Sequence, residues 1–179
     1  MRTLTLLRHA RSSHDAPTEA DFDRPLNRRG MRAAERIGRF IADEGLTFDR
    51  VLASPAVRVR ETIAGVEAGL GRPLGAEYDR RLYLAGADSL FDIIAETADD
   101  IGHLLLVGHN PGLEMLLLEA SAGHANALRH EAELKYPTAT LASIAFADAK
   151  IWPDAGPGTG EVIRFVRPRD LDSTLGPDF

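Results

Sequence analysis

The chain contains no cysteine, and this absence excludes disulfide bonds, thiolate metal sites and a cysteine nucleophile together. It also lacks any apolar stretch that approaches the ~20 residues of a membrane-spanning helix. Neither the phosphate-binding loop G-x-x-x-x-G-K-[ST] nor the metal-binding pattern H-E-x-x-H occurs, which argues against a nucleotide-binding loop and a metalloenzyme. Met1 and Arg2 run directly into a predicted strand without a signal-peptide pattern, so we expect a cytoplasmic protein.

Length and composition are those of an ordinary globular protein. The 179 residues suit one domain, which we place at residues 1–166, followed by a loose C-terminal tail at 167–179. Apolar residues make up 44% and charged residues 27% of the chain, as expected for a water-exposed surface around one core. The net charge of −6 disfavours binding to nucleic acid or to an anionic membrane.

Hydrophobic periodicity predicts strands that alternate with helices. Strands are expected at residues 3–8, 49–53, 76–79, 104–108, 140–146 and 162–166. Asn27 is the expected N-cap of a helix that reaches Asp43. The next helix is expected to start at Ser54-Pro55, with Ser54 as N-cap. A third helix is expected over residues 88–99, capped by Asp88 or Ser89. A further helix follows the strand at 104–108, and 124–134 is a polar helical stretch. This alternation predicts a three-layer α/β/α sandwich with a central, mostly parallel sheet.

Two of the predicted strands end in histidine. Leu4–Ala10 delivers Arg8 and His9, and Leu104–Pro111 delivers His109 and Asn110. A third run, Val51–Arg58, brings Ser54 and Arg58 to the same kind of position. Ligands of open α/β sheets bind outside the carboxyl ends of the strands, so these side chains predict a shared cationic pocket that suits phosphate.

These motifs resemble those of the histidine phosphatase superfamily, the phosphoglycerate-mutase-like proteins. The resemblance rests on Arg8-His9-Ala10, Ser54-Pro55-x-x-Arg58 and Gly108-His109-Asn110-Pro111, in that order along residues 2 to 150. The stretches Arg8–Ser13, Asp21–Gly30 and Lys135–Ala139 are similar to those of the small SixA-type phosphohistidine phosphatases. The resemblance implies a phosphatase that works through a covalent phosphohistidine intermediate, without a metal or other cofactor.

The resemblance also implies a role for each pocket residue. His9 is the expected nucleophile, and Arg8 and Arg58 present guanidinium forks to phosphate oxygens. His109 is expected to donate a hydrogen bond to phosphate as an imidazolium. Ser54 and Asn110 are expected to bind phosphate or to orient the arginines and histidines. Arg60 cannot share the role of Arg58, because two residues along a helix are about 200° apart around its axis, whereas Thr62 lies on the face of Arg58.

The general acid is the least determined part of the predicted site. Asp88 is the candidate from the corresponding region, although it also fits a helix N-cap, and Asp15, Asp21 and Asp23 are further candidates. The nitrogen of phosphohistidine leaves more readily than an alkoxide and needs less protonation. The lack of a clear acid therefore favours a phosphohistidine substrate on a protein over a sugar phosphate.

Other functions remain open at this stage. A broad phosphomonoesterase that acts on small phosphate esters would use the same residues, and a non-catalytic relative would bind a phosphorylated protein without turnover. A metalloenzyme is the remaining rival, although no close cluster of histidine and aspartate occurs. His14, His103, His124 and His130 are expected to be structural or surface residues.

Overall fold

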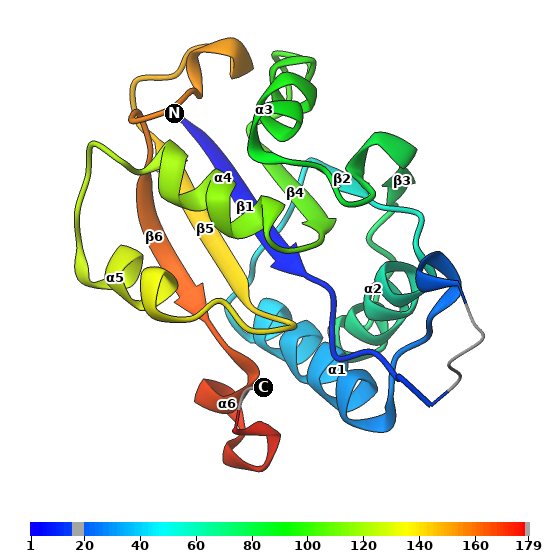
Figure 1. The fold of residues 1–179 in the computed structure, drawn as a ribbon. Helices are drawn as coiled ribbons and strands as arrows, with labels where there is room; N and C mark the ends of the chain where they lie inside the picture. Colours follow the sequence, from blue (N-terminus) through cyan, green and yellow to red (C-terminus); the bar gives the residue numbers. More distant parts are fainter. Residues whose placement is uncertain (16–19, 178–179) are drawn as a thin grey trace.

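A six-stranded mixed sheet forms the centre of the molecule (Figure 1). The structure is a computed structural model that describes residues 1–15 and 20–177. In chain order the strands are β1 (Arg2–Arg8), β2 (Arg50–Ala53), β3 (Glu77–Tyr78), β4 (His103–Gly108), β5 (Leu141–Phe146) and β6 (Glu161–Val166). Their spatial order is β3-β2-β4-β1-β5-β6. The first four strands are parallel and β5 is antiparallel to both of its neighbours, which confirms the predicted mostly parallel sheet.

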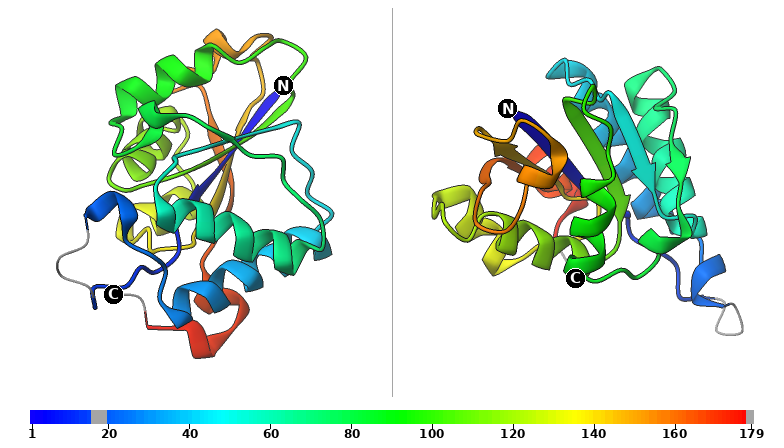
Figure 2. Two further views of the ribbon diagram at one scale, coloured as in Figure 1. Left: turned by 90° about the vertical axis from the view of Figure 1, so that its right-hand side faces the viewer. Right: turned by 90° about the horizontal axis from the view of Figure 1, so that it is seen from above.

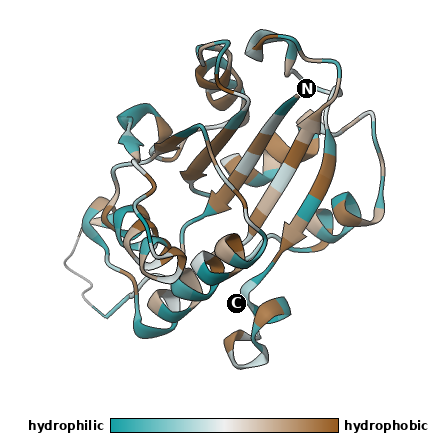
Figure 3. Ribbon diagram, turned by 180° about the vertical axis from the view of Figure 1, so that it is seen from behind, coloured by the Kyte–Doolittle hydropathy of each residue, from teal (hydrophilic) through white to brown (hydrophobic). Residues whose placement is uncertain are grey.

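Helices cover both faces of this sheet, as the views in Figure 2 show. The helices are α1 (Arg28–Asp43), α2 (Val57–Leu70), α3 (Ala87–Ala95), α4 (Gly112–Ala120), α5 (Ala127–Leu134) and α6 (Pro168–Leu171). Alternate residues of β1 separate two cores: Leu4 and Leu6 pack toward α3, α4 and α5, and Leu7 packs toward α1 and α2. The apolar colour of the strands in Figure 3 reflects this burial on both faces. The predicted three-layer α/β/α sandwich is confirmed.

Of the three helix N-caps predicted from the sequence, the structure confirms one and contradicts two. The side chain of Asn27 accepts a hydrogen bond from the backbone N–H of Gly30, as predicted for an N-cap. Helix α2 begins at Val57, two residues after Pro55, and α3 begins at Ala87 after Gly86. The predicted capping by Ser54 and by Asp88 or Ser89 was therefore wrong. Among the helices of the described residues, none has both the length and the hydropathy that crossing a bilayer requires.

Helix α1 makes backbone contacts at two glycines. A Cβ atom at Gly30 would lie 2.1 Å from the carbonyl oxygen of Arg11, in the loop that follows β1. A Cβ atom at Gly38 would lie 2.0 Å from the carbonyl oxygen of Val66 in α2. Both distances are far shorter than a van der Waals contact, so only glycine allows this close approach. Helix α1 therefore packs directly on the backbone of α2 and on the loop after β1.

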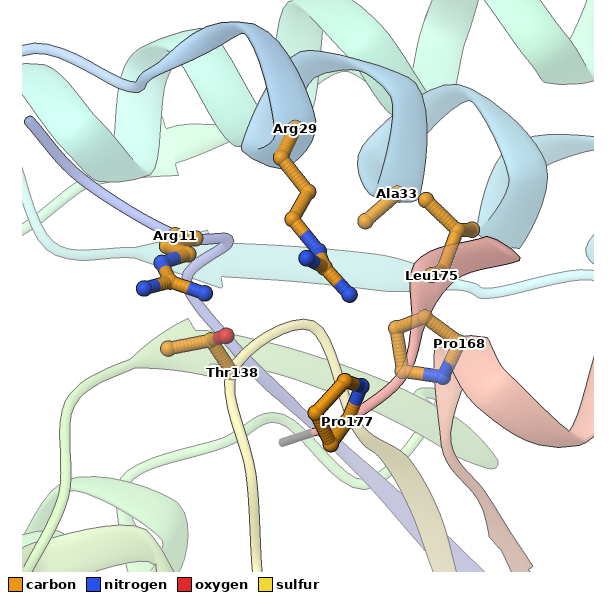
Figure 4. A pocket seen from close by; sticks show the side chains of 7 residues that line it. All are labelled: Arg11, Arg29, Ala33, Thr138, Pro168, Leu175 and Pro177. Carbon is orange, nitrogen blue, oxygen red and sulfur yellow. The ribbon is translucent and has the colours of Figure 1, made fainter. Parts of the chain in front are cut away.

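The C-terminal segment is not the loose tail that the sequence predicted. After β6 the chain forms α6 and a 3₁₀ turn at Ser173–Leu175, and the Leu175 side chain is buried against the α1–α2 core. Arg29 donates to the carbonyl of Gly176, and Arg32 Nη2 donates to Thr174 Oγ1 at 2.9 Å. Figure 4 shows Arg29 reaching from α1 toward Pro168 and Pro177. Residues 178–179 of the predicted tail lie outside the described residues.

Candidate active site

The register of the parallel strands brings the two motif histidines together. Arg8 is paired with Gly108 at the ends of β1 and β4, and the His9 N–H donates to the Gly108 carbonyl at 3.0 Å. The ring centroids of His9 and His109 are 5.3 Å apart. After β1 the chain turns to α1 on one face of the sheet, whereas after β4 it turns to α4 on the other. The pair thus lies at a topological switch point, where open α/β sheets bind ligands.

A polar pocket opens around this pair. Its described lining residues are Arg8, His9, Arg11, Ser12, His14, Asp21, Arg24, Arg58, Leu84, His109, Asn110 and Thr138. Arg11 and Thr138 also line a smaller neighbouring cavity between α1 and the C-terminal segment (Figure 4). Four arginines line the pocket together with one carboxylate, so its lining suits an oxyanion.

The hydrogen bond of His9 fixes which of its nitrogens is free. Nδ1 lies 2.7 Å from the carbonyl oxygen of Ala10, and because a carbonyl only accepts, Nδ1 carries the proton. Nε2 of the neutral ring then keeps its lone pair. Burial, with smaller contributions from the nearby His109, Arg58 and Arg8, lowers the pKa of His9 to about 3. At neutral pH the ring is therefore uncharged and its Nε2 can act as a nucleophile.

His109 is also neutral in the free protein. Its Nδ1 lies 3.2 Å from Arg58 Nη2, and because a guanidinium only donates, Nδ1 is the acceptor. Nε2 then donates to Ser54 Oγ at 2.8 Å. Burial, with a second contribution from Arg58, lowers the pKa of His109 to about 4. The imidazolium predicted from the sequence does not describe this unliganded state.

Ser54 lies behind His109 and not in the pocket. Its side chain is fully buried, and it is absent from the described pocket lining. The predicted contact with phosphate does not fit this position, whereas the alternative role of orienting a histidine does.

Arg8 and Asn110 converge on one backbone carbonyl. Arg8 Nη1 donates to the Tyr136 carbonyl at 2.8 Å, and Asn110 Nδ2 donates to the same oxygen at 3.2 Å. Within the described residues, Nε of Arg8 and Nε of Arg58 are buried without a hydrogen-bond partner. Buried donors of this kind cost about 1–3 kcal/mol each when unpaired.

The two arginines of α2 point to different places, as their spacing predicts. Arg58 is 2% exposed and lines the pocket, whereas Arg60 is exposed and lies over the ring of Tyr78 at 4.1 Å. Thr62, on the face of Arg58, accepts from the Ala10 N–H at 2.9 Å and donates to the Arg58 carbonyl at 2.6 Å. Thr62 thus links the backbone beside His9 to the helix turn that carries Arg58.

The carboxylate that lines the pocket is Asp21, and Asp88 does not line it. Asp88 is exposed in the first turn of α3, so its predicted role as general acid does not fit its position. Asp15 and Asp23 are exposed and also absent from the lining. The hydroxyl of Tyr83 donates to Asp21 Oδ2 at 2.5 Å, and this bond, together with Arg24 and Arg58, holds the pKa of Asp21 below its usual range. An ionised carboxylate of this kind has no proton to donate.

Sequence reasoning missed several lining residues. Arg11, Ser12 and Arg24 lie between β1 and α1 and line the pocket. They do so because this segment folds back over the end of the sheet, and no local sequence pattern predicts that path. Thr138 belongs to the Lys135–Ala139 stretch, which the sequence singled out without a role. Of the four histidines expected to be structural, His14 lines the pocket and is exposed; His103, His124 and His130 do not line it.

The buried neutral histidines predict a loss of stability in mild acid. An unfolded histidine takes up a proton near pH 6.5, whereas His9 and His109 stay neutral in the folded protein to about pH 3 and 4. The unfolded state therefore binds more protons below pH 6.5, and the free energy of unfolding falls as pH falls. By pH 5 each histidine should contribute a loss of at most about 2 kcal/mol.

Urea unfolding at pH 7 and pH 5 measures this effect. The His109→Gln variant cannot take up a proton at this position, so its loss of stability between the two pH values should be smaller than that of the natural protein. The exposed His130 provides the matched control, and His130→Ala should follow the natural protein. Equal pH dependence in all three proteins would contradict the assignment of His109 as a buried neutral group.

Comparison with known proteins identifies relatives whose similarity to this protein covers nearly the whole chain. Residues 4–83 match the family model of the histidine phosphatase superfamily (branch 1). The uncharacterized protein Rv1276c of Mycobacterium tuberculosis is 34% identical over 165 residues, which cover 91% of this chain and 100% of the relative.

Two solved structures are similar in both fold and sequence. A candidate phosphohistidine phosphatase SixA from Agrobacterium tumefaciens matches with a TM-score of 0.74 and 31% identity, covering 93% of this chain and 98% of that one. A candidate SixA from Nakamurella multipartitia matches with a TM-score of 0.79 and 27% identity, covering 93% and 96%. Both matches extend well beyond the family-model segment.

Proposed function

Because this chain belongs to the histidine phosphatase superfamily and is a SixA-type phosphatase, we propose that it dephosphorylates phosphohistidine on a protein. The observation that carries the proposal is the free Nε2 of the neutral His9, beside two arginines in a pocket whose described lining holds no protonated carboxyl group. A cytoplasmic location and independence from metal and other cofactors belong to the same proposal.

In the first step of the proposed reaction, His9 attacks the phosphoryl group. A bond forms between Nε2 and phosphorus while the phosphorus–nitrogen bond of the substrate breaks. The electron pair of that bond stays on the departing nitrogen, and the substrate imidazole leaves as a neutral ring because its other nitrogen carries a proton. The His9 ring gains positive charge as Nε2 bonds to phosphorus. The Ala10 carbonyl, 2.7 Å from Nδ1, stabilises this charge through the N–H that it accepts.

The arginines stabilise the transferring group. Arg8 and Arg58 lie beside His9 and supply charge-assisted hydrogen bonds to the equatorial oxygens, where negative charge is spread in the transition state. His109 keeps its Nε2 hydrogen bond to Ser54; when the phosphate charge is close, Nδ1 takes up a proton, gives up the hydrogen bond from Arg58 and donates to a phosphate oxygen. In the second step water attacks phosphorus while the bond between phosphorus and Nε2 breaks. The electron pair of that bond returns to Nε2 and the protons of the water stay with the released phosphate, so His9 leaves as the neutral ring.

The state of Asp21 supports a labile substrate. An alkoxide leaving group needs a proton from a general acid, and the carboxylate that lines the pocket is held ionised by Tyr83, Arg24 and Arg58. An imidazole leaving group has much less need of that proton. The pocket is therefore better suited to phosphohistidine than to a sugar phosphate.

The test compares phosphate release from a phosphohistidine-bearing carrier protein and from an aryl phosphate, both in EDTA. We expect the carrier protein to be dephosphorylated faster and EDTA to have no effect. Faster turnover of the aryl ester would indicate a broad phosphomonoesterase instead. Loss of activity in EDTA would indicate a metalloenzyme, and stoichiometric binding of the carrier protein without release would indicate a non-catalytic relative.

A further inference from the structure

Asp21 occupies the arginine that the proposed reaction needs for phosphate. Arg58 Nη1 donates to the backbone carbonyl of Asp21 at 2.7 Å, and Nη2 donates to its Oδ2 at 3.1 Å. Nη2 also donates to His109 Nδ1 at 3.2 Å, so both terminal nitrogens of this buried side chain are already hydrogen-bonded. A phosphate that binds to this guanidinium fork must therefore displace Asp21.

The position of Asp21 is fixed from several elements. Tyr83 donates to Oδ2 at 2.5 Å and Arg24 Nη2 contacts Oδ1 at 3.0 Å. The neighbouring Phe22 packs edge-on against the Tyr83 ring, with centroids 5.1 Å apart, and Arg80 lies over Phe22 at 4.9 Å. This packing holds the 3₁₀ turn at Asp21–Asp23 against the turn at Arg80–Leu82.

The carboxylate and a phosphate are alternatives for the same donors. Asp21 meets the two terminal nitrogens of Arg58 with its backbone carbonyl oxygen and with Oδ2, and a phosphate would meet them with two of its own oxygens. The carboxylate and the phosphate both carry negative charge. If Asp21 stayed beside Arg58 while a phosphate dianion bound, the two anions would repel each other. Besides Arg58, the charged and titratable groups that face Asp21 are Arg24, Tyr83 and, at longer range, His109.

We propose that Asp21 is a specificity-determining residue that competes with phosphate for Arg58 and so excludes small phosphate compounds from the resting pocket. The inference rests on the proposed function, since it takes Arg58 as a phosphate ligand. A small anion must displace Asp21 with the contacts of the phosphoryl group alone. A phosphorylated protein gains further contacts, for which Leu84, a lining residue that is 57% exposed, offers an apolar surface.

Titration calorimetry with inorganic phosphate tests the competition directly. Asp21→Asn removes the competing charge and keeps the side-chain size, so phosphate should bind about fivefold more tightly than to the natural protein. Asp23 lies in the same turn, is exposed and does not line the pocket, so Asp23→Asn is the matched control and should bind phosphate as the natural protein does. If Asp21 instead served only to hold Arg58 in place, Asp21→Asn would bind phosphate more weakly, which would overturn the proposal.

A kinetic ratio gives a second, independent readout. Asp21→Asn should raise kcat/KM for an aryl phosphate relative to that for a phosphohistidine carrier protein, and an unchanged ratio would contradict the inference. Should Asp21→Asn fail to fold, Tyr83→Phe removes the 2.5 Å hydrogen bond that holds the carboxylate and should also tighten phosphate binding. Weaker binding in Tyr83→Phe would then overturn the proposal.

The Arg58→Ala variant separates failure of this inference from failure of the proposed function. If phosphate binding is lost in Arg58→Ala but is not tightened in Asp21→Asn, the phosphate site stands and the competition is wrong. If Arg58→Ala binds phosphate as well as the natural protein, Arg58 is not the phosphate ligand and both proposals fail.

Discussion

Replacing His9 with alanine should abolish phosphate release, with a fall in rate of roughly four orders of magnitude or more. The reason is that no other described pocket residue combines a free nucleophilic nitrogen with a fixed tautomer: the Nδ1 of His109 accepts from Arg58 and its Nε2 donates to Ser54. His130, exposed on α5, supplies the control, and His130→Ala should keep full activity. Release is measured on both the phosphohistidine carrier protein and the aryl phosphate.

Trapping the intermediate makes this prediction specific to the nucleophile. Rapid quenching of the natural protein with labelled substrate should leave phosphate on His9, in a bond that is labile in acid and stable in base. The His9→Ala variant should carry no label. Label on a different residue, or turnover by His9→Ala above a hundredth of the natural rate, would show that another group attacks phosphorus.

The second large effect is expected at Arg58. Arg58→Ala removes a buried guanidinium from beside the transferring phosphoryl group, and kcat/KM should fall by about 10²- to 10³-fold, as for other preorganised donors. Arg60→Ala removes an exposed arginine that lies over the Tyr78 ring and donates to the Pro55 carbonyl, and kcat/KM should change less than about twofold.

The pair of variants on α2 contains its own control. Both remove an arginine from the first turns of one helix, so an effect on helix stability alone would be similar in the two proteins. Arg58→Lys keeps the charge but loses the planar fork, so its activity should lie between that of Arg58→Ala and the natural protein. Equal losses in Arg58→Ala and Arg60→Ala would refute the assignment of Arg58 to the pocket.

The sequence was sufficient to predict the residues at the strand ends. His9 and His109 each follow a buried strand, and parallel strands place their carboxyl ends at one edge of the sheet, so the meeting of the two rings followed from periodicity. Arg58 was separable from Arg60 for a similar reason, since helix geometry allows only one of them to face inward.

Residues in loops could not be predicted in the same way. Asp88 was preferred over Asp21 as the pocket carboxylate, but the path of the loop after β1 is set by contacts such as that of Asp21 with Arg58, which involve residues 37 positions apart. Ser54 precedes a proline and so has the local pattern of a helix cap, whereas the histidine to which it is hydrogen-bonded, His109, is 55 residues away in the sequence. Local patterns carry no information about such partners.

The glycine contacts of α1 have a consequence for how this protein can be altered. Gly30 places α1 against the backbone beside the nucleophile, and Gly38 places it against the helix that carries Arg58. No layer of side chains lies at these two points to absorb a change in spacing, so the three segments form one stiff frame. Helix α1 therefore sets the separation of the catalytic groups although none of its own residues is among the described lining of the pocket. Mutational libraries aimed at substrate range should leave its inner face untouched and vary the loops instead.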